Sequence, residues 1–246
     1  MDEPIRLHSY VALQRELAPS LAARLLTRIF FRPAAVMENR QVAAGLHLIT
    51  LEGSALRDLP WSPGDKLQVR IGPGLLTRTY TPTRWDAARG STQILAHALA
   101  AGPGSEWVRG AAPGEKVSLF GPRRSLALAA FDPQRSVMVG DETALGLAAA
   151  WRPSHALIEA VNPRAIQDLL DAMHVSGTAM TAQPQGLHLD ALANAALGLA
   201  AADTCFVLVG RARTVQSLLR TLRAHGIGSD RILTKAYWAD GKAGLD

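Results

Sequence analysis

The sequence changes its pattern once, near residue 130, and this change constrains the fold more than any other feature. Before it, short apolar runs follow one another closely, and residues 67–71 alternate strictly between apolar and polar side chains. Turn sequences containing Pro, Gly and an acidic residue, at 62–65 and 112–115, precede two of these runs. Alternation bounded by turns is typical of strands with one buried face. Residues 36–130 are therefore predicted to form a small antiparallel β-barrel.

After residue 132 the apolar runs are separated by helical patterns. The predicted strands are 137–139, 156–161, 206–209 and 232–237. One helix face is marked by the spacing of Val215, Leu218, Leu219 and Leu222. Alternating strands and helices predict a parallel sheet with helices on both faces, and ligands beyond the carboxyl ends of its strands. Residues 131–246 are therefore predicted to be a separate α/β domain.

Residues 1–35 carry a different pattern, with apolar residues four positions apart and arginines on another face. The apolar positions are Leu13, Leu17, Leu21, Leu25 and Ile29. This spacing predicts an amphipathic helical extension that packs on the barrel. A role at a partner or membrane surface is the alternative.

Composition excludes several classes of protein. The chain has 246 residues, 48% of them hydrophobic and 19% charged, which is typical of globular domains and excludes a disordered class. No apolar stretch reaches the roughly 20 residues of a membrane span, and the first residues lack a secretory signal pattern, so a cytoplasmic location is expected. Cys205, the single cysteine, excludes intramolecular disulfides and Cys-rich metal sites. The net charge of +5 comes from scattered arginines, so nucleic acid is not an expected partner.

The segment Arg78-Thr79-Tyr80-Thr81-Pro82 groups a permanent cation, an aromatic ring and a hydroxyl at the end of a predicted strand. Strand alternation would place Arg78 and Tyr80 on one side. A flavin nucleotide requires a cation for its phosphates, a flat surface for its ring and a hydrogen-bond partner near N5. An ordinary strand and turn is the alternative interpretation.

Further candidates follow in the chain. They are His97, the loop Gly102, Pro103, Gly104 and Ser105, and Trp107. Glycines allow backbone N–H groups to approach a pyrophosphate, and the start of a helix adds a partial positive charge. Each piece alone also has a structural interpretation, as a turn or a hydrogen-bonded histidine, and the order of the pieces favours a flavin site.

This ordered set resembles the siderophore-interacting protein family, a branch of the ferredoxin-reductase-like flavoproteins. Members carry an Arg-x-Tyr-Thr segment, then a His, then Gly-Pro-x-Ser with a nearby Trp; the resemblance spans about residues 36–241. It implies an FAD-binding barrel followed by an NAD(P)H-binding domain. It also implies that Arg78 neutralises FAD phosphate, Tyr80 stacks on the flavin and Thr81 hydrogen-bonds near N5. The loop 102–105 would hold the pyrophosphate.

In the second domain the resemblance continues at Gly140, Asp141, Glu142 and Thr143. These residues end a predicted strand and open a helix, with Thr143 as the expected helix cap, so the position suits the nicotinamide nucleotide. The two acidic side chains would repel phosphates, and the resemblance places them nearer the nicotinamide or ribose. An ordinary helix cap is the alternative.

The remaining candidates lie near the last two predicted strands. Arg211 and Arg213 replace a Gly-Glu pair expected from the resemblance; they would hold an adenosine phosphate or an anionic chelate, or form a solvated surface pair. Lys235 is grouped with them as a candidate substrate-binding residue. Tyr237 and Trp238 follow the last strand, where an aromatic ring would cover the flavin or pack between the domains.

The resemblance implies an FAD-dependent NAD(P)H:ferric-siderophore reductase that passes hydride to flavin and single electrons to chelated Fe(III). No catalytic residue and no protein-bound metal is assigned. One alternative keeps the flavin and nicotinamide but gives the electrons to a protein such as a ferredoxin, docked on the basic surface. Another is a flavin-free binding module with the same fold.

Overall fold

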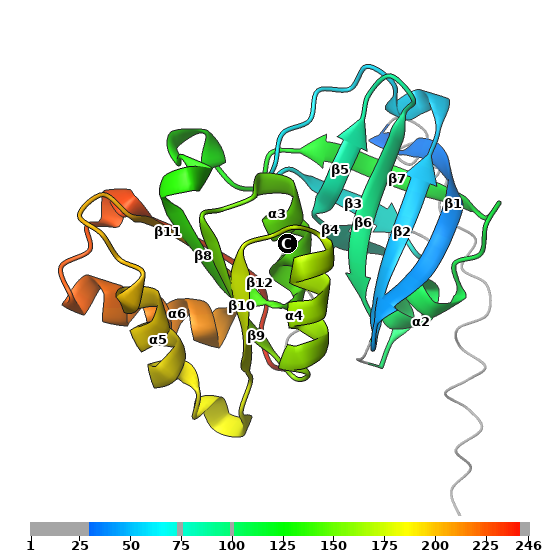
Figure 1. Cartoon of the computed structure of the whole chain (residues 1–246). Coiled ribbons are helices and arrows are strands. Elements are labelled where there is room, and N and C mark those ends of the chain that lie inside the picture. Colours follow the sequence, from blue (N-terminus) through cyan, green and yellow to red (C-terminus); the bar gives the residue numbers. More distant parts are fainter. Residues whose placement is uncertain (1–29, 73–75, 99–100, 242–246) are drawn as a thin grey trace, which may run out of the picture.

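The protein consists of two β-sheets with helices, seen side by side in Figure 1, and the computed structural model describes residues 30–72, 76–98 and 101–241. The first sheet is antiparallel, with strand order β4-β3-β7-β1-β2-β6-β5. Its strands are β1 (Arg32–Ala43), β2 (Leu46–Glu52), β3 (Lys66–Arg70), β4 (Thr77–Tyr80), β5 (Pro82–Asp86), β6 (Ser91–His97) and β7 (Lys116–Arg123). Helix α2 (Pro103–Gly110) connects β6 to β7.

The second sheet is parallel, with strand order β10-β9-β8-β11-β12. Its strands are β8 (Ser136–Asp141), β9 (His155–Ala160), β10 (Gly177–Thr181), β11 (Cys205–Arg211) and β12 (Ile232–Trp238). Between them lie the short 3-10 turn η5 (Glu142–Ala144) and the helices α3 (Leu145–Trp151), α4 (Pro163–Ala172), α5 (Leu189–Gly198) and α6 (Ala212–Ala224). Helices α3 and α4 cover the face toward the barrel, and α5 and α6 cover the other (Figure 1).

The predicted fold class is confirmed, with differences at three places. Strand β1 begins at Arg32, so residues 32–35 are not part of a helical extension; Ala34 and Val36 are buried in the barrel, and Arg32 pairs with Leu119. Residues 1–29 of the predicted extension lie outside the described residues. Residue 30 is helical and residue 31 is irregular. Strand β10 was not predicted, because it is a short edge strand with few apolar residues. Tyr237 and Trp238 belong to β12 and do not follow it.

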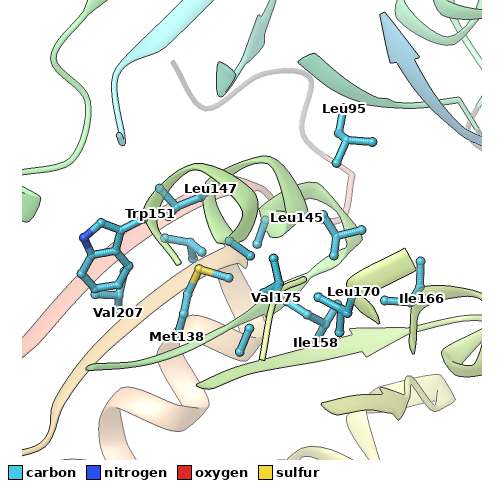
Figure 2. Packing of buried hydrophobic residues seen from close by; sticks show 14 of the residues in the cluster. Leu95, Met138, Leu145, Leu147, Trp151, Ile158, Ile166, Leu170, Val175 and Val207 are labelled. Carbon is cyan, nitrogen blue, oxygen red and sulfur yellow. The ribbon is translucent and has the colours of Figure 1, made fainter. Parts of the chain in front are cut away.

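One of the hydrophobic clusters is shared by the two sheets. Leu46 and Leu95 of the barrel belong to the same buried cluster as Met138 of β8 and Leu145 and Leu147 of α3. Figure 2 shows this cluster, with Leu95 beside the helix that carries Leu145 and Leu147. A continuous apolar contact between domains opposes their relative motion. Among the described residues no helix has the length and apolar character needed to cross a membrane.

Candidate functional site

The barrel contributes a cation at the start of a helix. Strand β4 pairs with β3, so that Arg78 lies opposite Val69 and Tyr80 opposite Leu67, on the same side of the strand. The side chain of Arg78 crosses the first turn of α2, since a Cβ atom added at Gly104 would lie 2.9 Å from its Nε. No side chain caps this helix start at Gly102. A guanidinium beside uncapped backbone N–H groups is an arrangement that binds anions.

An aromatic pair lies next to this cation. The ring centroids of Tyr80 and Trp107 are 5.9 Å apart with an interplanar angle of 43°. Trp107 is buried, and its indole Nε1 has no hydrogen-bond partner. Burial raises the pKa of the Tyr80 phenol, and the neighbouring Arg78 opposes this only in part, so the ring stays neutral. Trp107 thus supports Tyr80 from the interior of the barrel.

These residues fit a flavin dinucleotide. Gly102 has φ +125°, and a Cβ atom added there would meet nothing within 4 Å, so the backbone at the helix start is open to a ligand. The cation of Arg78 and the first turn of α2 suit a pyrophosphate, and the ring of Tyr80 suits a flat isoalloxazine. The structure brings together Arg78, Tyr80, the loop 102–105 and Trp107, as the sequence predicted.

Thr81 and Pro82 lie where the barrel meets the second domain. Pro82 is buried and opens β5, opposite Ile94. A Cβ atom added at Gly146 in α3 would lie 2.7 Å from the carbonyl oxygen of Thr81. The absence of a side chain at Gly146 therefore allows the backbone of α3 to approach the end of the Arg78–Thr81 segment.

His97 ends β6, opposite Leu46, and is half-buried. Desolvation lowers the pKa of its imidazole, while the carboxylate of Glu142 in the second domain acts in the opposite direction. The electrostatic effect of Glu142 shows that His97 lies close to the start of α3. Neutral imidazole is therefore the favoured form of a residue at the boundary between the two sheets.

In the α/β domain, Asp141 is the centre of a hydrogen-bond network at the carboxyl end of β8. It is only 3% exposed. Its Oδ1 accepts from the backbone N of Thr143, at 2.8 Å, and from the Thr143 hydroxyl; its Oδ2 accepts from Nε1 of Trp238 at 2.7 Å. Burial raises the pKa of Asp141 to about 6, although the hydrogen bonds from Thr143 and Trp238 oppose the shift.

The predicted role of Thr143 as helix cap was wrong. The capping side chain is Asp141, which accepts from the backbone N of Thr143. Glu142 is also engaged, because its Oε1 accepts from the backbone N of Val161 at 2.8 Å. Gly210 (φ +101°) allows β11 to approach this network, since an added Cβ would lie 2.7 Å from Asp141 Oδ2. Both acids are therefore used inside the domain and do not point freely at a phosphate.

The two arginines after β11 differ in their surroundings. Arg211 donates from Nε and a terminal nitrogen to Oδ2 of Asp240, at 3.1 and 2.6 Å, and its guanidinium lies 5.3 Å from the ring centroid of Trp238. Its charge is therefore neutralised by a carboxylate. Arg213 is exposed and donates to the backbone carbonyl of Gln185.

The last strand places the remaining candidates. Lys235 pairs with Val209 of β11, and Tyr237 packs against the shared core. Trp238 is 36% exposed. The hydrogen bond to Asp141 holds Trp238 against the carboxyl ends of β8 and β11, which is where a nicotinamide binds in a sheet of this kind.

One buried network was not found from the sequence. Glu159 in β9 is 3% exposed; its Oε1 accepts from the hydroxyl of Thr214 at 2.6 Å and its Oε2 from Nε2 of His188. Nδ1 of His188 accepts from the backbone N of Gln183 at 2.9 Å. Glu159 lies in an otherwise apolar run, and that single acid in a predicted strand was the available signal.

Comparison with known proteins gives a match in the barrel. Residues 68–126 match the family model of the siderophore-interacting FAD-binding domain. The matched range includes Arg78, Tyr80, residues 102–105 and Trp107, so the candidate residues of the barrel all lie within it.

Other similar proteins extend the similarity to both sheets. An NADPH-dependent ferric-chelate reductase of Escherichia coli (strain K12) is 25% identical over 254 residues, covering 89% of this chain and 97% of the relative. A siderophore-interacting protein from Aeromonas hydrophila has the same fold, with a TM-score of 0.70 and 22% identity over 87% of this chain and 93% of its own. A ferredoxin NADP+ reductase from Neisseria gonorrhoeae, solved with FAD and NADP, has a TM-score of 0.68 at 17% identity, covering 85% of this chain and 99% of its own.

Proposed function

We propose that this protein is an FAD-dependent NAD(P)H:ferric-siderophore reductase. The observation that carries the proposal is the position of the Arg78 guanidinium across the first turn of α2, next to the contacting rings of Tyr80 and Trp107. This cation, helix start and aromatic surface lie inside residues 68–126, which match the model of the siderophore-interacting FAD-binding domain. The similarity to the E. coli ferric-chelate reductase over most of both chains supports the choice of reaction.

On the barrel side, Arg78 and the backbone of residues 102–105, which form the start of α2, would hold the pyrophosphate of FAD. Tyr80 would bear the flavin ring, with Trp107 behind it, and the hydroxyl of Thr81 would hydrogen-bond near N5. Pro82 and His97 would line the same FAD site beside these residues. Bound FAD supplies the conversion of a two-electron nicotinamide donor into one-electron steps.

On the α/β side, the segment from Gly140 to Thr143 would receive the nicotinamide nucleotide at the carboxyl ends of β8 and β11. Asp141 fixes Trp238 there by the hydrogen bond from its indole. Tyr237 and Trp238 would exclude water from the flavin and nicotinamide. Electron transfer requires no protein acid or base, so these residues act by orientation and water exclusion.

The ferric siderophore is the substrate, and each nicotinamide oxidised to NAD(P)+ reduces two chelated Fe(III) ions to Fe(II) with release of one proton. Exposed cations attract an anionic chelate. Arg213, which is exposed, and Lys235, which is half-buried in β12, remain candidates for that contact. Arg211 is less suited, because Asp240 already neutralises its guanidinium. A ferredoxin-type acceptor and a cytoplasmic location stay predictions from the sequence.

The test is a visible spectrum of the protein with FAD, followed under anaerobic conditions by NADPH or NADH and then by a ferric siderophore with an Fe(II) trap. We expect flavin bands that bleach with the nicotinamide, recover with the chelate and yield trapped Fe(II). Bleaching without recovery would exclude the siderophore as acceptor. A protein that does not retain FAD would overturn the proposal.

A further inference from the structure

The outward side of β3 and β7 in the barrel combines cations with an aromatic ring. The inward side of these strands faces the barrel core with Leu67, Val69, Val117 and Leu119. Strand alternation turns the residues between them outward. The outward residues are Lys66, Gln68 and Arg70 on β3 and Lys116, Ser118 and Phe120 on β7. Gln68 lies opposite Phe120 and Arg70 opposite Ser118, so the outward residues form one continuous surface.

Three phenylalanines meet at one end of this surface, where β1 begins beside β7. The ring centroid of Phe120 lies 6.0 Å from that of Phe30 and 5.7 Å from that of Phe31. Phe30 is 48% exposed. The guanidinium of Arg123 lies 4.0 Å from the ring centroid of Phe120 and donates to the side-chain oxygen of Gln68 at 2.6 Å. Exposed aromatic side chains beside a fixed cation mark a surface that contacts another molecule.

Strands β3 and β7 carry positive charge only. Their charged residues are Lys66, Arg70, Lys116 and Arg123. Asp65 and Glu115, the acids that precede these strands, each accept from a backbone N–H of their own turn. Within the described ranges, Arg70, Lys116 and Arg123 have no carboxylate partner. A surface with this charge attracts anions. We call the surface formed by Phe30, Phe31, Arg70, Lys116, Phe120 and Arg123 the basic aromatic face.

The basic aromatic face is also the place where the described part of the chain begins. No described helix makes more than marginal contact with β3 or β7. Residues 1–29 precede Phe30 directly, so they join the barrel at this face. In their sequence the apolar positions four apart are Leu13, Leu17, Leu21, Leu25 and Ile29. Apolar residues at this spacing, with arginines on another face, are typical of segments that lie on a membrane surface.

A lipid surface fits the basic aromatic face better than a nucleic acid does. Phenylalanine has no polar group, so its ring gains free energy by leaving water for the boundary between head groups and acyl chains. Cations beside it remain among anionic head groups. The ring of Phe30 meets that of Phe120 at 66°, edge to face, and the pair therefore offers no flat platform on which bases could stack.

We propose that the basic aromatic face binds the surface of an anionic lipid bilayer, with Phe30 and Phe31 entering the boundary of the acyl chains and with the cations of β3 and β7 contacting the head groups. The binding does not depend on the proposed function. Arg78, the candidate phosphate ligand, pairs with Val69, whose side chain is buried in the barrel core, so the flavin candidates and the basic aromatic face lie on opposite sides of the same strands.

The experiment is sedimentation of the full chain with vesicles of phosphatidylcholine alone and with vesicles of phosphatidylcholine and phosphatidylglycerol in equal parts. We expect binding to the anionic vesicles, little binding to the neutral ones, and release in high salt, which screens the attraction. Arg70→Glu should weaken binding about tenfold, because it removes an attractive charge and adds a repulsive one. Phe30→Ser should weaken binding about fivefold, because the exposed half of the ring no longer leaves water.

The matched controls change the same kinds of side chain in the α/β domain. Arg220→Glu on α6 makes the same change in net charge at an exposed position. Leu187→Ser removes an apolar side chain that is 73% exposed. Both controls should bind anionic vesicles as the unaltered protein does. The thermal midpoint of each variant verifies that its fold is retained.

No sedimentation with anionic vesicles would overturn the proposal, as would equal binding to neutral and anionic vesicles. Binding by Arg70→Glu and Phe30→Ser as tight as that of the controls would also overturn it, because residues 1–29 alone would then account for the binding. Size-exclusion chromatography tests the remaining occupant. A dimer that Phe30→Ser converts to a monomer, without sedimentation of the unaltered protein, would assign the basic aromatic face to a second copy of the chain instead.

Discussion

Gly146 of α3 lies against the carbonyl oxygen of Thr81, so close that a Cβ atom would be 2.7 Å from that oxygen. At this contact the helix that follows the segment Gly140–Thr143 meets the end of the strand that carries Arg78 and Tyr80. The oxygen belongs to the backbone and cannot rotate away, so a side chain at Gly146 would have to displace one of the two elements.

Gly146→Ala is therefore expected to lower the thermal midpoint and weaken FAD binding, although alanine in a helix is intrinsically favoured over glycine by about 1 kcal/mol. Thermal unfolding with and without FAD measures both effects. Gly198→Ala, at the end of α5 with nothing within 4 Å of the added Cβ, is the control and should be neutral or slightly stabilising. A Gly146→Ala protein as stable as this control would contradict the importance of the contact.

Arg78→Ala should weaken FAD binding about 10- to 100-fold, because it removes the cation that crosses the helix start while leaving the fold intact. Equilibrium titration of the apoprotein with FAD, followed by flavin fluorescence, measures the change. Arg84→Ala on β5, the next strand in the chain, removes an exposed arginine and should have little effect. Equal affinities of the two variants would show that Arg78 does not hold the phosphate.

Asp141 makes stability depend on pH in an unusual direction. Its folded pKa, about 6, lies above the ordinary value of 3.8, so between these values the folded protein binds a proton that the unfolded chain does not. The contribution of Asp141 to stability is therefore greatest below about pH 4 and is lost as pH rises through 6. Urea unfolding of the protein and of Asp141→Asn at pH 5 and pH 7 tests this. Relative to Asp141→Asn, the unaltered protein should have a lower free energy of unfolding at pH 7 than at pH 5. A difference independent of pH would exclude the raised pKa.

His188→Ala should destabilise the fold by about 3 kcal/mol, because it leaves the buried carboxyl group of Glu159 without one of its two donors. Chemical denaturation measures the loss. His155→Ala, which removes a hydrogen bond of 3.0 Å to Thr178 in a more exposed position, should cost less than 1 kcal/mol. Similar losses in both variants would argue against a special role of the Glu159 network.

The barrel site was predictable because its parts are close in sequence or follow in a fixed order. Arg78 and Tyr80 share a strand, and alternation alone places them on one side. Helix α2 begins at the predicted loop, and Trp107 is one turn further on. Strand alternation was thus sufficient to predict that Arg78 and Tyr80 share a side, whereas the contact between Tyr80 and Trp107 was not predicted.

The α/β site was predicted less well, because its contacts join residues far apart in the chain. Nothing local shows that Trp238 donates to Asp141, that Asp240 neutralises Arg211 or that His188 covers Glu159. Thr143 was assigned as the helix cap from its residue type. The carboxylate of Asp141, two residues earlier, is better placed to accept from the backbone N–H of Thr143. Partners supplied by tertiary packing decide the role of each polar side chain here.

The core shared by the two sheets has a kinetic consequence. Rotation of one domain away from the other would expose Leu46 and Leu95 to water and separate them from α3, so a hinge-closing step is disfavoured. The spacing between electron donor and flavin is then set when the chain folds. Reduction of the flavin by saturating nicotinamide should therefore proceed at the same rate in buffer and in viscous sucrose solution, as in an enzyme limited by chemistry and not by domain movement.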